Sequence, residues 1–137
     1  SAKDMIHDAV KNALIKEGWM IIADPYTIKY KEVKLFADLA GEKTLAATKK
    51  EQKIIIEVKS FVSRSKIRDL ETALGQYLIY RTFMGLIDSD YKIYLAIDQD
   101  TYTTFFQQIA IQLILNDYQL SLLTIDFNRE EVKQWIN

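Results

Sequence analysis

Two charged residues interrupt the most apolar segment of the chain. In KIIIEVKSF, residues 53–61, Glu57 and Lys59 follow a run of three isoleucines. Side chains two positions apart on an extended strand project from the same face, so Glu57 and Lys59 lie side by side. The opposite face carries Ile54, Ile56 and Val58. We therefore expect one face of this strand to belong to the core and the other, on the open side of the sheet, to carry chemistry.

A second carboxylate, Asp38, stands near the end of the segment VKLFADLA, and pairing of the two strands would bring it beside Glu57. Carboxylate oxygens are preferred ligands of Mg²⁺ and Mn²⁺, and a bound divalent ion neutralises a phosphate group and acidifies a water molecule. The carbonyl of Val58 is a third oxygen ligand. Lys59 is placed to orient the water and to stabilise developing negative charge. Together these residues predict a metal-dependent centre that hydrolyses phosphodiester bonds.

The spacing Glu-x-Lys does not identify this centre by itself. It also occurs at Glu32, Glu51 and Glu131, each with a lysine two positions later. The site around Glu57 differs by the isoleucines before it, by Asp38 upstream and by a long helix downstream. Charges on a buried strand cost several kcal/mol per ion unless they are paired or bound to a metal, so their presence there needs compensation. The alternative is a half-exposed strand with a cross-strand ion pair.

The spacing of apolar residues predicts the elements that position these side chains. A helix is expected over residues 2–18, where Gly18 ends it, and a long amphipathic helix over 63–85, where Gly85 ends it. Strands are expected at 19–23, 27–30, 33–40, 53–61, 91–97 and 120–127, with 44–49 as a hairpin partner of 53–61. Residues 101–119 are helical in one or two pieces, with their aromatic residues in the core, and 130–136 fit either a strand or a helical turn. This alternation predicts an α/β fold with helices covering a mixed sheet.

Length and composition set limits on the class of protein. The chain has 137 residues, 49% of them hydrophobic, which is enough for the core of a single domain over residues 1–137. With no cysteine, a thiolate metal site or a cysteine nucleophile is excluded. No apolar run is long enough to span a bilayer, and phosphate-binding glycine loops are missing. We expect a soluble cytoplasmic protein that does not use ATP or a nicotinamide cofactor.

The charge is divided unevenly along the chain. Residues 1–85 hold 15 Lys or Arg against 11 Asp or Glu, a balance of +4, and residues 86–137 hold 3 against 8, a balance of −5. This division suggests that the first part faces phosphates and that the second contacts a protein, although scattered solvated charge gives the same totals. Two basic clusters flank the proposed centre and would contact DNA phosphates, or are solvated ends of elements: Arg64, Lys66 and Arg68, and Lys49, Lys50 and Lys53.

Two other residues are candidates for joining the metal. His7, the only histidine, lies on the first helix at the edge of its apolar stripe. It is either a metal ligand or a hydrogen-bonded surface residue. Glu42, four residues after Asp38, would supply a carboxylate if the strand ended early.

These residues and their order resemble a known nuclease fold. The order αβββαβ, with Asp38 followed by Glu57 and Lys59, resembles the PD-(D/E)xK fold of restriction enzymes and Holliday-junction resolvases, except that alanine replaces the proline before Asp38. The resemblance implies a restriction-endonuclease-like core with a C-terminal αβ addition. Gln76 and Tyr80, one helical turn apart, are similar to the Gln-x-x-x-Tyr element of RecB-like nucleases, which implies that Gln76 steadies the metal site and Tyr80 contacts a phosphate.

Along its whole length the chain resembles the XisH family of nitrogen-fixing cyanobacteria. The similarity lies in SAKDMIHDAVKNALIKEGW, EVKSF, ALGQYLIYR, YLAI, TYTTFF and QWIN. It implies a controlling factor for excision of the fdxN element, a DNA rearrangement carried out by a separate recombinase with XisI as companion. Two functions are consistent with this resemblance. One is a Mg²⁺-dependent DNA endonuclease, and the other is a non-catalytic regulatory or assembly subunit that binds XisI, DNA or the recombinase, with a homodimer as a further possibility.

Overall fold

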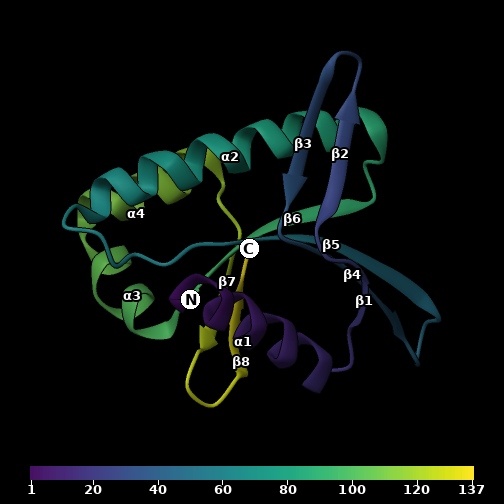
Figure 1. The fold of residues 1–137 in the computed structure, drawn as a ribbon, viewed down its shortest axis with the longest axis horizontal. Coiled ribbons are helices and arrows are strands. Elements are labelled where there is room, and N and C mark those ends of the chain that lie inside the picture. The colour runs from purple at the N-terminus through teal and green to yellow at the C-terminus, as the bar shows by residue number, and fades with distance from the viewer.

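Helices cover both faces of a mixed β-sheet in the computed structural model, which describes residues 1–137 (Figure 1). The helices are α1 (Ala2–Lys16), α2 (Lys66–Ile87), α3 (Gln99–Thr103) and α4 (Ile109–Tyr118), with a 3₁₀ turn η1 (Phe105–Gln107). The strands are β1 (Met20–Ala23), β2 (Tyr26–Tyr30), β3 (Val33–Ala37), β4 (Leu39–Leu45), β5 (Lys50–Val58), β6 (Tyr91–Asp98), β7 (Leu122–Asp126) and β8 (Glu131–Ile136). The predicted α/β class is therefore confirmed.

Six strands form the main sheet in the order β1-β4-β5-β6-β7-β8. The three central strands β5, β6 and β7 are parallel, and the outer pairs are antiparallel. Strand β4 forms an antiparallel hairpin with β5, with Leu39 opposite Ile56, but the predicted bounds of the partner strand are wrong. Of residues 44–49 only Thr44 and Leu45 belong to β4, and residues 46–49 form the turn. Strands β2 and β3 pair only with each other, as a ribbon that extends away from the sheet beside α2 (Figure 1). No helix is long and apolar enough to cross a membrane.

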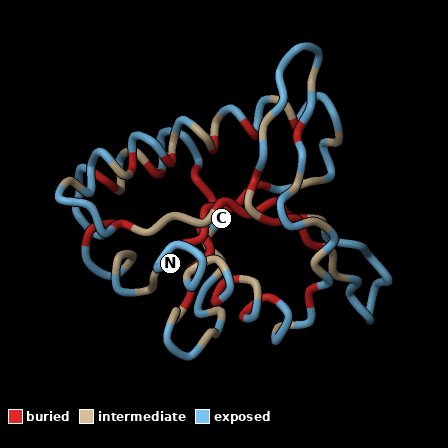
Figure 2. Tube along the Cα trace, in the orientation of Figure 1, coloured by how far each residue is buried: buried red, intermediate tan, exposed pale blue.

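The core has two parts, one on each side of the sheet (Figure 2). The helices α2 and α4 pack on one face, where Ile55 belongs to the larger cluster, and α1 packs on the other, where Ile54 and Ile56 belong to the smaller one. Both faces of β5 are thus covered, as is usual for a central strand of a parallel sheet. The expectation that Glu57 projects from an open face is wrong, because α2 lies over that face.

Several element boundaries differ from the sequence prediction. The strand predicted at 33–40 is two strands in different sheets, and the chain changes sheet at Asp38. The long helix begins at Lys66, because the Ser65 hydroxyl accepts a hydrogen bond from the Arg68 amide at 3.3 Å and caps it. The helix also continues past Gly85, since burial of Met84 in the core outweighs the low helix propensity of glycine.

The remaining segments refine the predicted pattern. Gly18 follows the end of α1 with φ of 98°, a conformation that favours glycine, so the predicted stop is confirmed. The predicted helix at 101–119 consists of three short pieces, α3, η1 and α4, and residues 131–136 form the edge strand β8. Phe105 and Phe106 are buried, which confirms their place in the core.

Candidate functional site

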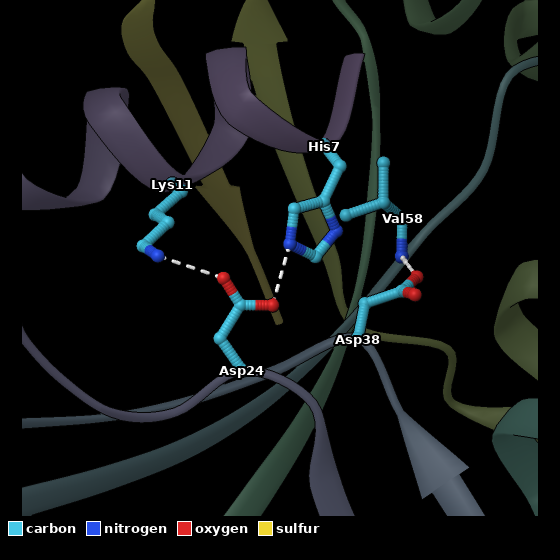
Figure 3. A network of polar contacts seen from close by, with 5 residues as sticks. All are labelled: His7, Lys11, Asp24, Asp38 and Val58. Atoms are coloured by element: carbon cyan, nitrogen blue, oxygen red, sulfur yellow. Dashed lines mark hydrogen bonds and ion pairs between the residues drawn. The ribbon is translucent and has the colours of Figure 1, made fainter. Parts of the chain in front are cut away.

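Asp38 occupies the point where the chain leaves β3 and enters β4. Its Oδ2 atom accepts a hydrogen bond of 2.7 Å from the backbone amide of Val58 (Figure 3). The pairing of β4 with β5 ends where Leu39 lies opposite Ile56. Beyond this point β4 has no backbone carbonyl that could accept a hydrogen bond from the Val58 amide of β5. The carboxylate takes the place of that missing carbonyl, and this contact holds Asp38 against the carboxyl end of β5.

Glu57 lies on the same stretch of β5 and is almost completely buried, with 5% of its surface exposed. Its Oε2 atom lies 3.9 Å from Nζ of Lys59, at the outer limit of an ion pair. Its Oε1 atom is buried and has no hydrogen-bond partner. A buried carboxylate oxygen without a partner is costly, so this position is one where a bound cation would compensate.

The surroundings of Glu57 favour a neutral or cation-bound carboxyl group. Burial, together with the nearby negative charge of Asp38, raises the pKa of Glu57 from 4.5 to about 7, and Lys59 and the Tyr80 hydroxyl oppose this only in part. Near neutral pH the Glu57 carboxyl group is therefore partly protonated. A divalent ion between the two carboxylates would displace that proton, because it supplies the positive charge that Lys59 only partly provides.

Two residues of α2 contribute to this environment, one helical turn apart. The Oε1 atom of Gln76 is buried and has no hydrogen-bond partner. It is free to accept a hydrogen bond from a group bound in the site. Tyr80 is 4% exposed, and its hydroxyl donates a hydrogen bond of 3.1 Å to the Phe36 carbonyl. The structure thus disagrees with a phosphate contact for Tyr80. Burial, with the charges of Glu57 and Asp38, raises the pKa of this hydroxyl, which remains protonated.

A cavity of about 390 Å³ opens between α1 and α2 at the carboxyl end of β5. Among the residues that line it are His7, Asp38, Val58, Lys59, Asp69 and Thr72. Ligands of α/β proteins commonly bind at the carboxyl ends of parallel strands, and the cavity lies at that edge of this sheet. Three of the residues that sequence spacing predicted for the centre, Asp38, Val58 and Lys59, therefore share one cavity, with the Glu57 carboxyl group within 3.9 Å of Lys59.

His7 forms one wall of this cavity and belongs to a network that the sequence did not reveal. Its Nε2 atom lies 2.7 Å from Oδ1 of Asp24, and Oδ2 of Asp24 accepts a hydrogen bond of 2.7 Å from Lys11. The other ring nitrogen of His7 is turned toward Val58 and Asp38 (Figure 3). Asp24 therefore fixes the direction of the imidazole, and no spacing in the sequence indicates that the loop after β1 returns to α1.

The other predicted residues are placed differently. Glu42 does not line the cavity. It lies opposite Lys53 toward the far end of β5, where a hydrogen bond with Glu51 raises its pKa. Lys66 donates a hydrogen bond of 2.8 Å to the Phe61 carbonyl, so its ammonium group is used within the loop before α2.

The remaining basic side chains are mostly exposed. Arg64 lies in the loop before α2 and Arg68 on its first turns, where Arg68 lies 3.7 Å from Glu71. Lys49 and Lys50 lie at the turn between β4 and β5. These four remain available to a polyanion, and their contact with DNA stays a prediction.

The acidic second half of the chain reaches the same edge of the sheet. Asp98 ends β6 and Asp126 ends β7, and both strands run parallel to β5. Burial of Asp98, together with the negative charges of Asp100 and Asp126, raises its pKa. Two acidic residues of the second half therefore stand at the same edge of the sheet as the candidate centre, and the assignment of this half to a protein contact stays a prediction.

The donor set fits a divalent ion held by few protein ligands. Two carboxylates, Asp38 and Glu57, lie beside the Val58 backbone, and the unpartnered Oε1 atom of Glu57 would gain a partner. No group of three or more His, Cys, Asp or Glu side chains is arranged to hold a metal ion. Mg²⁺ commonly binds through one or two carboxylates and leaves its other positions to water and substrate phosphate, as this set requires.

Comparison with known proteins shows the family. The model of the XisH protein family matches residues 1–133. The chain belongs to the XisH family. The crystal structure of an fdxN element excision controlling factor protein from Anabaena variabilis is 40% identical, with a TM-score of 0.89, and the match covers 98% of this chain and 99% of that one. An XisH family protein from Nostoc punctiforme PCC 73102 is 38% identical, also with a TM-score of 0.89, and the match covers 98% and 100% of the two chains. Curated proteins give no match.

Proposed function

We propose that this XisH family protein is a Mg²⁺- or Mn²⁺-dependent DNA endonuclease of the PD-(D/E)xK type that acts in excision of the fdxN element. The observation that carries the proposal is the meeting of Asp38, Glu57 and Lys59 at the end of β5, with a buried carboxylate oxygen left without a partner. A cytoplasmic location, where chromosomal DNA lies, is part of the same proposal.

The order of elements supports a restriction-endonuclease-like core. In the main sheet the chain runs α1, β1, β4, β5, α2, β6, which is the order αβββαβ, and the segment from α3 to β8 is the C-terminal addition. Asp38 immediately precedes the second of the three strands, and Glu57 is the last residue but one of the third. The ribbon β2–β3 is inserted between the first two strands. Its last residue, Ala37, is buried where the nuclease motif has proline.

Each residue has a separate role in this proposal. Asp38, Glu57 and the Val58 carbonyl hold the metal ion. When bound, the ion supplies charge neutralisation of the phosphate and a water molecule of lowered pKa. Lys59 donates hydrogen bonds to the attacking water or to a phosphate oxygen and so stabilises developing charge. Gln76 braces the buried carboxyl group from α2. Tyr80, through its bond to the Phe36 carbonyl, holds the backbone that leads into Asp38 and does not contact phosphate.

A second candidate function is control without cleavage. The relative from Anabaena variabilis is named a controlling factor, a description of regulation and not of hydrolysis. In this function the protein keeps the nuclease-like fold and acts by binding DNA, the recombinase or an XisI-like partner, either alone or as a homodimer. A fold does not establish turnover, so only an assay separates the two functions.

The test is cleavage of labelled duplex, single-stranded and branched DNA by the purified protein, with Mg²⁺ or Mn²⁺, and with and without an XisI-like partner. The proposal expects metal-dependent products with the wild type and none with Glu57→Gln or Asp38→Asn. Glu51→Gln is the matched control, because Glu51 belongs to a Glu-x-Lys pair on the same strand but lies outside the cavity.

The outcomes separate the two candidate functions. DNA binding by the wild type without cleavage of any substrate, with or without partner, would reject the endonuclease and favour control. Equal cleavage by the wild type and Glu57→Gln would show that the hydrolysis comes from another site or from a contaminant.

A further inference from the structure

The ribbon β2–β3 carries an exposed, positively charged surface. Residues 26–37 contain Lys29, Lys31 and Lys34 but one acidic residue, Glu32. The ribbon pairs with no other strand and extends beside α2 away from the main sheet (Figure 1). Figure 2 shows most of its outer part exposed.

The two faces of the ribbon differ in character. One face is anchored: Ile28 is 1% exposed, and the Tyr30 ring lies 5.9 Å from that of Phe83 on α2. The other face carries Thr27, Lys29, Lys34 and Phe36, all exposed, and Phe36 keeps 55% of its surface accessible. Since side chains alternate between faces of a strand, these four residues form one continuous outer surface.

Two lysines of this outer surface oppose each other directly. Lys29 is the cross-strand partner of Lys34, and like charges in that arrangement destabilise a pair of strands. Neither ammonium group has an acidic partner within 4 Å, and no ion pair involves Lys31 at the tip. The Lys34 ammonium group lies 5.6 Å from the centroid of the Phe36 ring, a contact that does not neutralise its charge. Two neighbouring lysines without an acidic partner fit a polyanion that supplies the missing negative charge.

We infer that the ribbon β2–β3 is a DNA-binding arm that enters a groove of the duplex and contacts its phosphates through Lys29, Lys31 and Lys34. A two-stranded ribbon fits the major groove of B-DNA, which is about 12 Å wide. The charge of the ribbon complements the phosphates of both groove edges. The inference rests on the proposed action on DNA, but it requires neither the metal nor cleavage.

The arm and the candidate centre are joined by a very short stretch of chain. Ala37 ends the ribbon and Asp38 follows it directly. Lys34 precedes Asp38 by four residues, and four extended residues span at most about 14 Å. With a rise of about 3.4 Å per base pair, this distance corresponds to about four base pairs. We therefore expect Lys34 to contact a phosphate within about four base pairs of the phosphate that binds at Asp38. Because Ala37 is fully buried and the Phe36 carbonyl accepts the Tyr80 hydrogen bond, the base of the arm is fixed, and Lys31 and Glu32 at its tip are exposed.

The experiment measures binding of a short labelled duplex in EDTA, at several salt concentrations between about 50 and 200 mM. The double variant Lys29→Thr, Lys34→Thr is expected to bind at least about tenfold more weakly, with a slope of log K against log salt smaller by about 2, because two phosphate contacts are lost. The matched control, Lys16→Ala, Lys133→Ala, removes the same charge from α1 and β8 and is expected to bind like the wild type.

A folding defect would not imitate this result. A cross-strand pair of threonines is favourable where two lysines repel, so the arm variant is expected to melt at the same temperature as the wild type or higher. Loss of binding with unchanged melting supports the arm.

Wild-type affinity and slope in the arm variant would overturn the inference while leaving the proposed nuclease intact. If the variant instead keeps its DNA affinity but loses self-association in sedimentation, the arm is a protein contact and the inference is likewise wrong. Failure of the wild type to bind any duplex would overturn the proposed function together with the arm.

Discussion

The sequence Glu-x-Lys occurs at both ends of strand β5, with Lys59 directly after its last residue, and the two ends differ in burial and in charge compensation. At the amino end, Glu51 is exposed, and Lys53 lies 3.7 Å from Asp88 and above the Tyr91 ring. At the carboxyl end, Glu57 is buried with one oxygen unpartnered, and Lys59 lies 3.9 Å away. Identical residue types at identical spacing thus lie apart at one end, where Lys53 pairs with Asp88, and form an incompletely compensated pair at the other.

The cause of the difference is the depth of the strand and not the motif. The amino end of β5 extends beyond the helices and pairs with the exposed end of β4, where water screens its charges. The carboxyl end lies between α1 and α2 in the centre of the sheet. Burial there raises the pKa of Glu57 and strengthens every interaction with a cation. The position of Glu-x-Lys along the strand, exposed or buried, therefore distinguishes a candidate metal site from a surface pair of charges.

The largest expected effect separates the two lysines. Lys59→Met is expected to reduce metal-dependent DNA cleavage on the order of 10²- to 10³-fold, since removal of one donor that stabilises developing charge typically costs that much. Lys53→Met should leave the rate within about twofold, because Lys53 lies outside the cavity. Single-turnover cleavage at saturating Mn²⁺ measures both. Equal losses in the two variants would show that burial does not distinguish the ends of β5.

The second prediction concerns stability in the absence of divalent ions. The pKa of Glu57 is about 7 in the folded protein against 4.5 for an exposed glutamate, so the folded state holds this proton more tightly. The proton on Glu57 therefore contributes to the free energy of unfolding. This contribution is complete below pH 4.5 and is lost as pH rises through about 7, a change of about 3 kcal/mol. Glu57→Gln should therefore be more stable than the wild type at pH 8, and the difference should shrink toward pH 4.5.

Urea unfolding at several pH values measures this difference, with Glu51→Gln as the control. Glu51 is exposed, so its substitution should change stability by less than about 0.5 kcal/mol at any pH. A Glu57→Gln protein that is destabilised at pH 8 would mean that the ionised carboxylate is well compensated in the folded state, contrary to its unpartnered oxygen.

A third prediction links the same proton to the metal. Mn²⁺ binding at Glu57 should release a proton below pH 7, so the affinity should fall by about tenfold per pH unit there and level off above pH 7. Calorimetry in two buffers of different ionisation enthalpy measures the released proton. Glu57→Gln should lose the binding and Glu51→Gln should keep it. Unchanged Mn²⁺ binding in Glu57→Gln would place the ion elsewhere.

Part of this site follows from sequence because it depends on local geometry. The two-residue period of a strand places Glu57 beside Lys59 whatever the fold, and the hairpin of β4 with β5 brings Asp38 to the same end. The isoleucines before Glu57 indicate burial of the strand. These are properties of one strand and its nearest neighbour, for which spacing is sufficient.

Other features depend on distant packing, and spacing does not reach them. Burial of Glu57 on its second face requires α2 to lie over it, and the buried position of Tyr80 follows from the same contact. The strand is interrupted at Asp38 because β3 pairs with β2 outside the main sheet. The apolar pattern of the segment is unbroken and therefore predicts one strand. Asp24 joins the cavity wall only because the loop after β1 meets α1.

The smallest expected effect concerns Asp24, whose pKa is shifted in the opposite direction from that of Glu57. Burial of Asp24 alone would raise its pKa, but the hydrogen bonds from Lys11 and His7 outweigh it and lower the pKa. The contribution is therefore present above pH 3.8 and is lost as pH falls through the lower, folded value. Asp24→Asn should lose up to about 1 kcal/mol at pH 7 and nothing near pH 2, as expected for a partly exposed pair. The exposed Asp8→Asn is the control in urea unfolding. A greater stability of Asp24→Asn than of the wild type at pH 7, as expected for Glu57→Gln, would contradict this. It would mean that the contacts of Asp24 with His7 and Lys11 in Figure 3 do not stabilise the ionised carboxylate.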